Sequence, residues 1–106
     1  MLIDEGRAAP LALASRITER TLTVLETVAR EPGLSNRAVA ERAGIRDGGQ
    51  ASRLLHRLRQ LGLVVNDGHG RGSANAWRLT PLGRQAESLA RRQRAWRSPP
   101  YDRPAR

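Results

Sequence analysis

One helical face between residues 49 and 60 gathers side chains that recognise other molecules through paired hydrogen bonds. An arginine guanidinium presents a fork of donors, and a glutamine amide presents a donor beside an acceptor, so each can bond one planar edge or anion twice. The apolar residues of the segment recur at helical spacing and define a buried stripe of Ala51, Leu54, Leu55, Leu58 and Leu61. The opposite face holds Gly49, Ser52, Arg53, His56 and Gln60, with Gln50 and Arg57 on its flanks. The segment therefore predicts an amphipathic helix whose outer face binds a polar or anionic partner.

Turn signals at both ends position this helix. Asp47 precedes Gln50 by three residues, which is the spacing of a capping box, so we expect Asp47 to begin the helix. Gly62 follows Leu61 and tolerates the left-handed conformation that ends many helices. Ile45 is expected to fill the turn that leads into the helix.

Two more helices are predicted before it. Apolar spacing indicates a first helix from residue 15 or 16 to Arg30, where a Pro-Gly pair interrupts the pattern. Ser35 can cap a second helix, which Gly44 would end after Ala43. The residues expected to be buried on the second helix are Ala38, Val39 and the stem of Arg42.

A hairpin is predicted after the third helix. Residues 63–66 and 75–79 are β-prone runs separated by the turn-forming stretch DGHGRGSA. In the second run Trp77 and Leu79 alternate with Arg78, so we expect one face of the hairpin to be buried.

The last predicted helix begins with Thr80 as its N-cap and Pro81 in its first turn, and runs to about residue 96. At spacings of four and three, one stripe of this helix comprises Leu82, Ala86, Leu89, Gln93 and Trp96. This stripe either closes the core of the monomer or pairs with a second subunit. Further candidates for a subunit contact are Leu2, Ile3, Leu11, Leu13 and Trp96.

The segment from Thr21 to Gln93 resembles the winged-helix core of MarR-like transcriptional regulators. The resemblance lies in the spacing from Ala40 to Gly44, in the stretch LLHRLRQLGLV, and in WRLTPLG after the hairpin. It implies a mostly helical α+β fold, a winged helix-turn-helix with a three-helix core, a two-stranded hairpin wing and a C-terminal helix. We expect this domain to span residues 15–96, between an N-terminal arm (1–14) and a basic, Pro-rich tail (97–106).

Charge is distributed unevenly along the chain. Residues 1–45 contain six arginines and six acidic residues, whereas residues 46–106 contain thirteen arginines and four acidic residues. The whole net charge of +9 thus belongs to the second part, and no lysine contributes to it. Such an asymmetry favours a polyanionic partner, although a high arginine content on solvated surfaces would also produce it.

Specific roles follow if the third helix enters the major groove of DNA. Gln50 matches the hydrogen-bonding edge of adenine and Arg53 that of guanine. Phosphate contacts are expected from Ser52, His56 and Arg57, and Gly49 would allow close approach of the backbone to the duplex.

Two more segments could contact DNA. Backbone N–H groups at Ser35, Asn36 and Arg37 could meet phosphate, although plain helix capping explains Ser35 equally well. Arg71 at the tip of the wing suits a narrow minor groove, or is simply a loop arginine. Arginines on the third helix could likewise form an ordinary solvated face.

Other classes of function are less well supported. The chain has no cysteine and only two histidines, and its acidic residues lack the spacing of a metal site or a catalytic pair, so we expect no enzyme, metal or cofactor. No apolar run is long enough to cross a membrane. We therefore expect a cytoplasmic, nucleoid-associated homodimer that binds double-stranded DNA as a transcriptional regulator. A protein-interaction or architectural winged helix, or one part of a larger regulator, is the alternative, and the sequence identifies no small-molecule effector.

Overall fold

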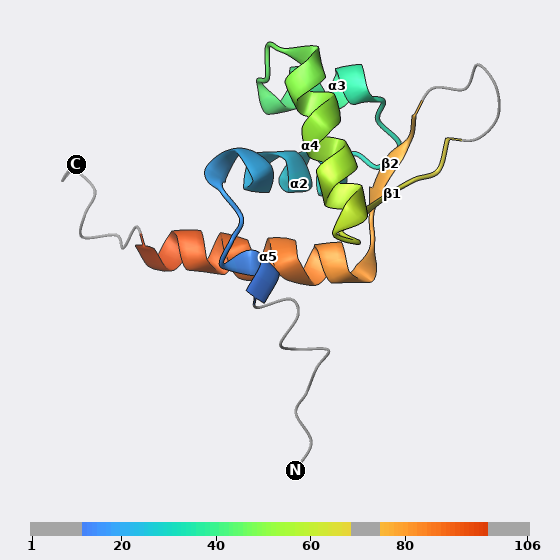
Figure 1. Cartoon of the computed structure of the whole chain (residues 1–106). Helices are drawn as coiled ribbons and strands as arrows, with labels where there is room; N and C mark the ends of the chain where they lie inside the picture. The colour runs from blue at the N-terminus through green and yellow to red at the C-terminus, as the bar shows by residue number, and fades with distance from the viewer. Residues whose placement is uncertain (1–11, 69–74, 98–106) are drawn as a thin grey trace.

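Four helices and a short hairpin make up the part of the chain that the computed structural model describes, which is residues 12–68 and 75–97. In chain order they are α2 (Glu19–Arg30), α3 (Asn36–Ala43), α4 (Gly48–Gln60), β1 (Val64–Asn66), β2 (Trp77–Leu79) and α5 (Pro81–Arg97). Figure 1 shows α5 as a long base beneath α2, with α3 and α4 on the other side of α2 and the hairpin at one edge. The predicted α+β winged-helix architecture is confirmed.

Side-chain caps set where the helices begin. Ser35 accepts a hydrogen bond from the Ala38 N–H, and Asp47 accepts from the N–H groups of Gly49 and Gln50, as predicted. The first helix was predicted to begin at residue 15 or 16, and this is wrong: α2 begins at Glu19. The reason is that Thr18 has an extended backbone and caps α2 through its side chain.

Glycines end two helices in the left-handed conformation. Gly44 follows α3 with φ 75° and Gly62 follows α4 with φ 80°, which confirms both predicted stops. Ile45 lies buried in the turn between α3 and α4, also as predicted.

The core lies between α2, α3, α4 and the hairpin. Its largest fully buried side chains include Trp77, Leu25, Leu55 and Leu58. One prediction of burial is wrong: Leu61 is 45 % exposed because it caps the C-terminus of α4 instead of continuing its inner face. The guanidinium of Arg42 reaches outward to Glu31, and Ala40 is buried on α3 beside Val39.

The hairpin is antiparallel, with Val64 opposite Leu79 and Asn66 opposite Trp77. Trp77 and Leu79 are buried and Arg78 is exposed, which confirms the predicted alternation. Trp77 also forms a bridge to Leu34, in the loop between α2 and α3. The wing is therefore fastened to the start of α3 as well as to its own partner strand.

The α5 helix packs on α2 through a face different from the predicted stripe. Its buried residues are Gly83, Ala86, Glu87 and Ala90, whereas Leu82, Leu89 and Gln93 are half-buried and the side chain of Trp96 lies outside the described residues. The face is rotated because small residues let α5 approach the chain closely. A Cβ on Gly83 would lie 2.0 Å from the Leu63 carbonyl oxygen. Of the two roles considered for this helix, the structure shows a contribution to the core through Ala86.

Arg94 ties α5 to α2 through two carboxylates. Its Nη2 lies 2.8 Å from Glu26 Oε2, and its Nη1 lies 3.6 Å from Glu19 Oε1. Residues 12–14, predicted to belong to a flexible arm, form a helical turn in which Ala14 is buried against Leu22 and Ala90. This end of the chain contributes to the packing of α2 on α5.

Candidate nucleic-acid interface

The outer face of α4 has the composition predicted for it. Ala51, Leu55 and Leu58 are buried, and Leu54 is half-buried. On the far side, five of the predicted contact residues are exposed: Gly49, Gln50, Arg53, His56 and Arg57. Asp47 holds the first turn of the helix by capping it. A rigid helix thus presents an arginine-bearing face to solvent.

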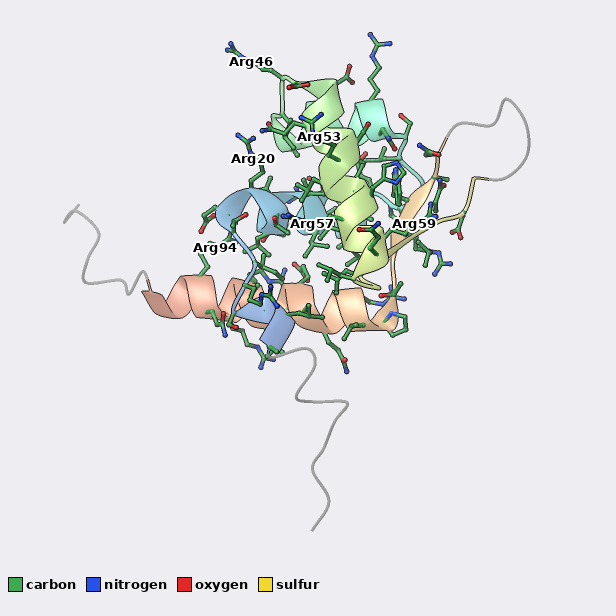
Figure 2. The ribbon with its side chains drawn as sticks, in the orientation of Figure 1. Arg20, Arg46, Arg53, Arg57, Arg59 and Arg94 are labelled. Atoms are coloured by element: carbon green, nitrogen blue, oxygen red, sulfur yellow. The ribbon has the colours of Figure 1, made fainter. Side chains whose placement is uncertain are left out.

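Arginines on and around this face lack carboxylate partners. No ion pair joins Arg20, Arg46, Arg53, Arg57 or Arg59 to an acidic residue within residues 12–68 and 75–97. By contrast, Arg42, Arg78 and Arg94 are paired. Figure 2 shows four of the unpaired side chains along α4 and the turn before it, and Arg20 on the first turn of α2. Uncompensated guanidinium groups at an exposed surface attract anions and can bind phosphate in bidentate fashion.

Gln50 differs from its expected role in the capping box. Its Oε1 accepts a hydrogen bond from Arg20 on α2, so the amide is turned sideways instead of back to Asp47. Among the described residues, the hydrogen bond of the Gln50 side chain is made by Oε1 and not by Nε2. Gln50 and Arg20 together form one polar group at the exposed end of α4.

Asn36 occupies the centre of a polar network that was not predicted. Its Nδ2 donates to Ser52 Oγ on α4 at 2.9 Å. Its Oδ1 accepts from Asn75 Nδ2 at 2.8 Å and from the indole N–H of Trp77. Trp77 is fully buried, so its N–H needs a protein acceptor. The Ser52 side chain, predicted to hold phosphate, thus bonds to the Asn36 side chain within the protein. The phosphate contact predicted for Asn36 concerned its backbone N–H and is not affected by this bond.

The network continues into the base of the wing. Asn75 accepts a hydrogen bond from Asn66 Nδ2 at 2.7 Å, and Asn66 Oδ1 accepts from the N–H groups of Gly68 and Ala76. We call the residues Asn36, Ser52, Asn66, Asn75 and Trp77 the asparagine network. It joins α3, α4 and both wing strands, so it fixes the direction in which the wing leaves the domain.

An ion pair joins β2 to the residue that follows β1 at the base of the wing. Arg78 Nε lies 2.7 Å from Asp67 Oδ2, and Nη2 lies 3.2 Å from Oδ1. The hydrogen bond and the charge of Asp67 raise the pKa of the Arg78 guanidinium above its ordinary value. Arg78 is therefore a paired arginine, unlike those on α4.

Three predicted residues remain to be placed. Ser35 caps α3, which is the plainer of its two readings. Arg37 is exposed, and its Nε lies 3.8 Å from Glu41 Oε2 on the same helix. An exposed ion pair of this kind contributes little to the stability of the fold. Arg71 lies outside the described residues.

Sequence reasoning missed two features of this surface, Arg20 and the asparagine network. Arg20 lies thirty residues before Gln50 in the sequence, and nothing local signals their contact. A partial signal for the network existed, because an indole N–H expected to be buried requires an acceptor and three asparagines flank the elements concerned.

Other kinds of site find little support. Within the described ranges no group of three or more His, Asp or Glu side chains is arranged to hold a metal ion. None of the described helices is long and apolar enough to cross a membrane. The hydrogen-bonding requirements of buried side chains are met throughout the described residues.

Comparison with known proteins agrees with this geometry. Residues 18–68, which run from the cap of α2 to the start of the wing, match the family model of the IclR helix-turn-helix domain. Among solved structures, the chain is similar to the multiple antibiotic-resistance repressor MarR from Listeria monocytogenes, with a TM-score of 0.58 and 23 % identity. That alignment covers 83 % of this chain and 58 % of the repressor, so the chain spans little more than half of the longer protein. No curated protein sequence matches the chain.

Proposed function

Starting from a winged helix-turn-helix of the kind found in transcription regulators, we propose that this chain binds double-stranded DNA sequence-specifically and regulates transcription. The observation that carries the proposal is the outer face of α4, where Arg53 and Arg57 are exposed and unpaired within the described residues. A helix with one apolar face and one arginine-bearing face has the shape and chemistry that the major groove accepts.

Each exposed side chain then has a role. Arg53 reads guanine through its guanidinium fork. Gln50 reads adenine with its Nε2 donor and with the second lone pair of Oε1, which the bond from Arg20 leaves free. His56 on the outer face and Arg57 on its flank contact phosphate. Gly49 lets the start of α4 approach the base edges closely.

The start of α3 and the wing complete the contact. Ser35, Asn36 and Arg37 lie in the first turn of α3, where backbone N–H groups and the Arg37 guanidinium can meet phosphate. The side chains of Asn36 and Ser52 instead hold α3 and α4 in register. Arg71, in the wing, enters the neighbouring minor groove or binds its backbone.

A homodimer is the form we propose for the binding protein. One winged helix contacts few base pairs, and a two-fold dimer doubles the site by reading a palindrome. Such a regulator acts on the nucleoid in the cytoplasm.

Selection from a random pool of duplex DNA at about 0.15 M salt tests this proposal, since exposed charges are substantially screened at that ionic strength. We expect enrichment of an inverted repeat whose half-sites are about one helical turn, or a multiple of it, apart. Binding without enrichment that disappears as salt rises would leave only a phosphate contribution and would favour an architectural role. Absence of binding to duplex DNA would favour a protein-interaction module.

A further inference from the structure

A groove beside α4 extends the arginine face onto α2. Its volume is about 510 Å³, and it is lined by Thr18, Arg20, Thr21, Gln50, Arg53, Leu54 and Arg57. We call it the arginine groove. Three of its seven lining residues are arginines and none is acidic, so it is a concentrated site of positive charge.

Neither of the nearest acidic residues in the sequence forms an ion pair with an arginine of the groove. Glu19 precedes Arg20, but its carboxylate lies 3.6 Å from Arg94 on the α5 side of α2. Asp47 caps the backbone of α4. The charge of Arg20, Arg53 and Arg57 is therefore not neutralised by a carboxylate within residues 12–68 and 75–97.

Arg20 is also held in place toward α4. One of its terminal nitrogens donates to Gln50 Oε1, which directs the guanidinium to the end of α4 that carries Arg53 (Figure 2). A fixed guanidinium loses less conformational entropy when it binds an anion, and its remaining N–H groups stay available.

Resting on the DNA-binding function proposed above, we propose that the arginine groove binds the phosphate backbone of the same duplex, with Arg20 as the principal contact. The helix α4 would lie in the major groove. A phosphate of the strand bordering that groove would meet the guanidinium of Arg20, and a neighbouring phosphate would meet that of Arg57. The DNA-binding surface thus includes the first turn of α2, outside the two helices of the helix-turn-helix itself.

The salt dependence of binding measures this contact. Each phosphate neutralised contributes about 0.9 to the slope of log K against log salt for B-form DNA. R20A should therefore reduce the magnitude of the slope by about 0.9. Between 50 and 200 mM salt, the fold-loss of affinity of the R20A variant should be about 3.5 times smaller than that of the wild-type chain. R20A should weaken binding to scrambled duplexes as well as to the specific one, because phosphate carries no sequence information.

Two control variants separate the contact from other effects. R30A removes an exposed arginine from the C-terminal end of the same helix and should leave the slope unchanged. Q50A removes the partner of Arg20 and should alter base preference without changing the slope. Circular dichroism and thermal unfolding of each variant establish that the fold is retained.

The outcomes are distinguishable. An unchanged slope for R20A, or the same fall for R30A or Q50A, would overturn the role of Arg20 while leaving DNA binding by α4 intact. Failure of the unchanged chain to bind duplex DNA would overturn the proposed function itself.

Discussion

Replacing Asn36 by alanine should destabilise the domain through the loss of one acceptor. The Asn36 Oδ1 receives the indole N–H of Trp77, which is fully buried, and the Nδ2 of Asn75. Asn75 and Ser52 are half-buried and can bond to water after the change, whereas the Trp77 N–H cannot. A buried donor left without a partner costs about 1–3 kcal/mol, so we expect N36A to lower the free energy of unfolding by about that amount. For a domain of this size the melting temperature should fall by about 5–20 °C.

A double-mutant cycle isolates the interaction. W77F keeps an aromatic ring in the core but has no N–H to satisfy. The loss of unfolding free energy caused by N36A should therefore be smaller in the W77F background than in the wild-type chain, by at least about 1 kcal/mol. N36D keeps the oxygen acceptor and should be milder than N36A. Urea unfolding followed by circular dichroism at 222 nm measures all five proteins, since it does not depend on tryptophan fluorescence.

Additivity would refute this reasoning. If N36A and W77F lower the unfolding free energy by amounts that sum to the loss in the double variant, within about 0.5 kcal/mol, the Asn36–Trp77 hydrogen bond contributes nothing of note. The Asn36–Trp77 hydrogen bond would then have no part in holding the wing on the domain.

Three further predictions concern α4 and its neighbours. R53A should lose about 1–3 kcal/mol of discrimination at one base pair, measured by binding to duplexes altered one position at a time, whereas R92A on the exposed face of α5 should retain it. G83A should lower the free energy of unfolding by about 1–3 kcal/mol because the new Cβ would meet the Leu63 carbonyl oxygen. G48A is the control, since a Cβ at position 48 would lie in open space and should not lower the stability. Equal melting temperatures of the two variants would contradict this prediction. D47A should lower the unfolding free energy by about 1 kcal/mol in urea titrations through loss of the α4 cap, and an unchanged midpoint would show that the cap is dispensable.

The fold was largely predictable because local chemistry and tertiary packing agree along most of the chain. Caps at Ser35 and Asp47 and left-handed glycines at 44 and 62 are local signals, and they fixed the ends of α3 and α4 to within a residue. The start of α2 was predicted too early because the apolar spacing begins at Ile17, before Thr18. Thr18 has an extended backbone and is the N-cap of α2, not part of the helix.

The surface was predictable in composition and less so in geometry. Periodicity alone placed Arg53 and Arg57 on the exposed face of α4. It could not show that Gln50 bonds to Arg20 or that Asn36 bonds to Ser52, because these contacts depend on how helices pack. The buried face of α5 was misjudged for a related reason: close packing against the chain at Leu63 requires Gly83, and hydrophobicity alone does not reveal that requirement.

Residue-by-residue mapping of DNA binding tests the central claim, that the outer face of α4 reads DNA. At 106 residues the chain suits nuclear magnetic resonance, in which backbone amide and arginine Nε–H signals are followed as the selected duplex is added. We expect the largest shifts in the first half of α4, at Arg53 and Arg57, and at Arg20, with little change at Arg92 on α5. Shifts confined to α5, with α4 unaffected at saturating DNA, would contradict the account.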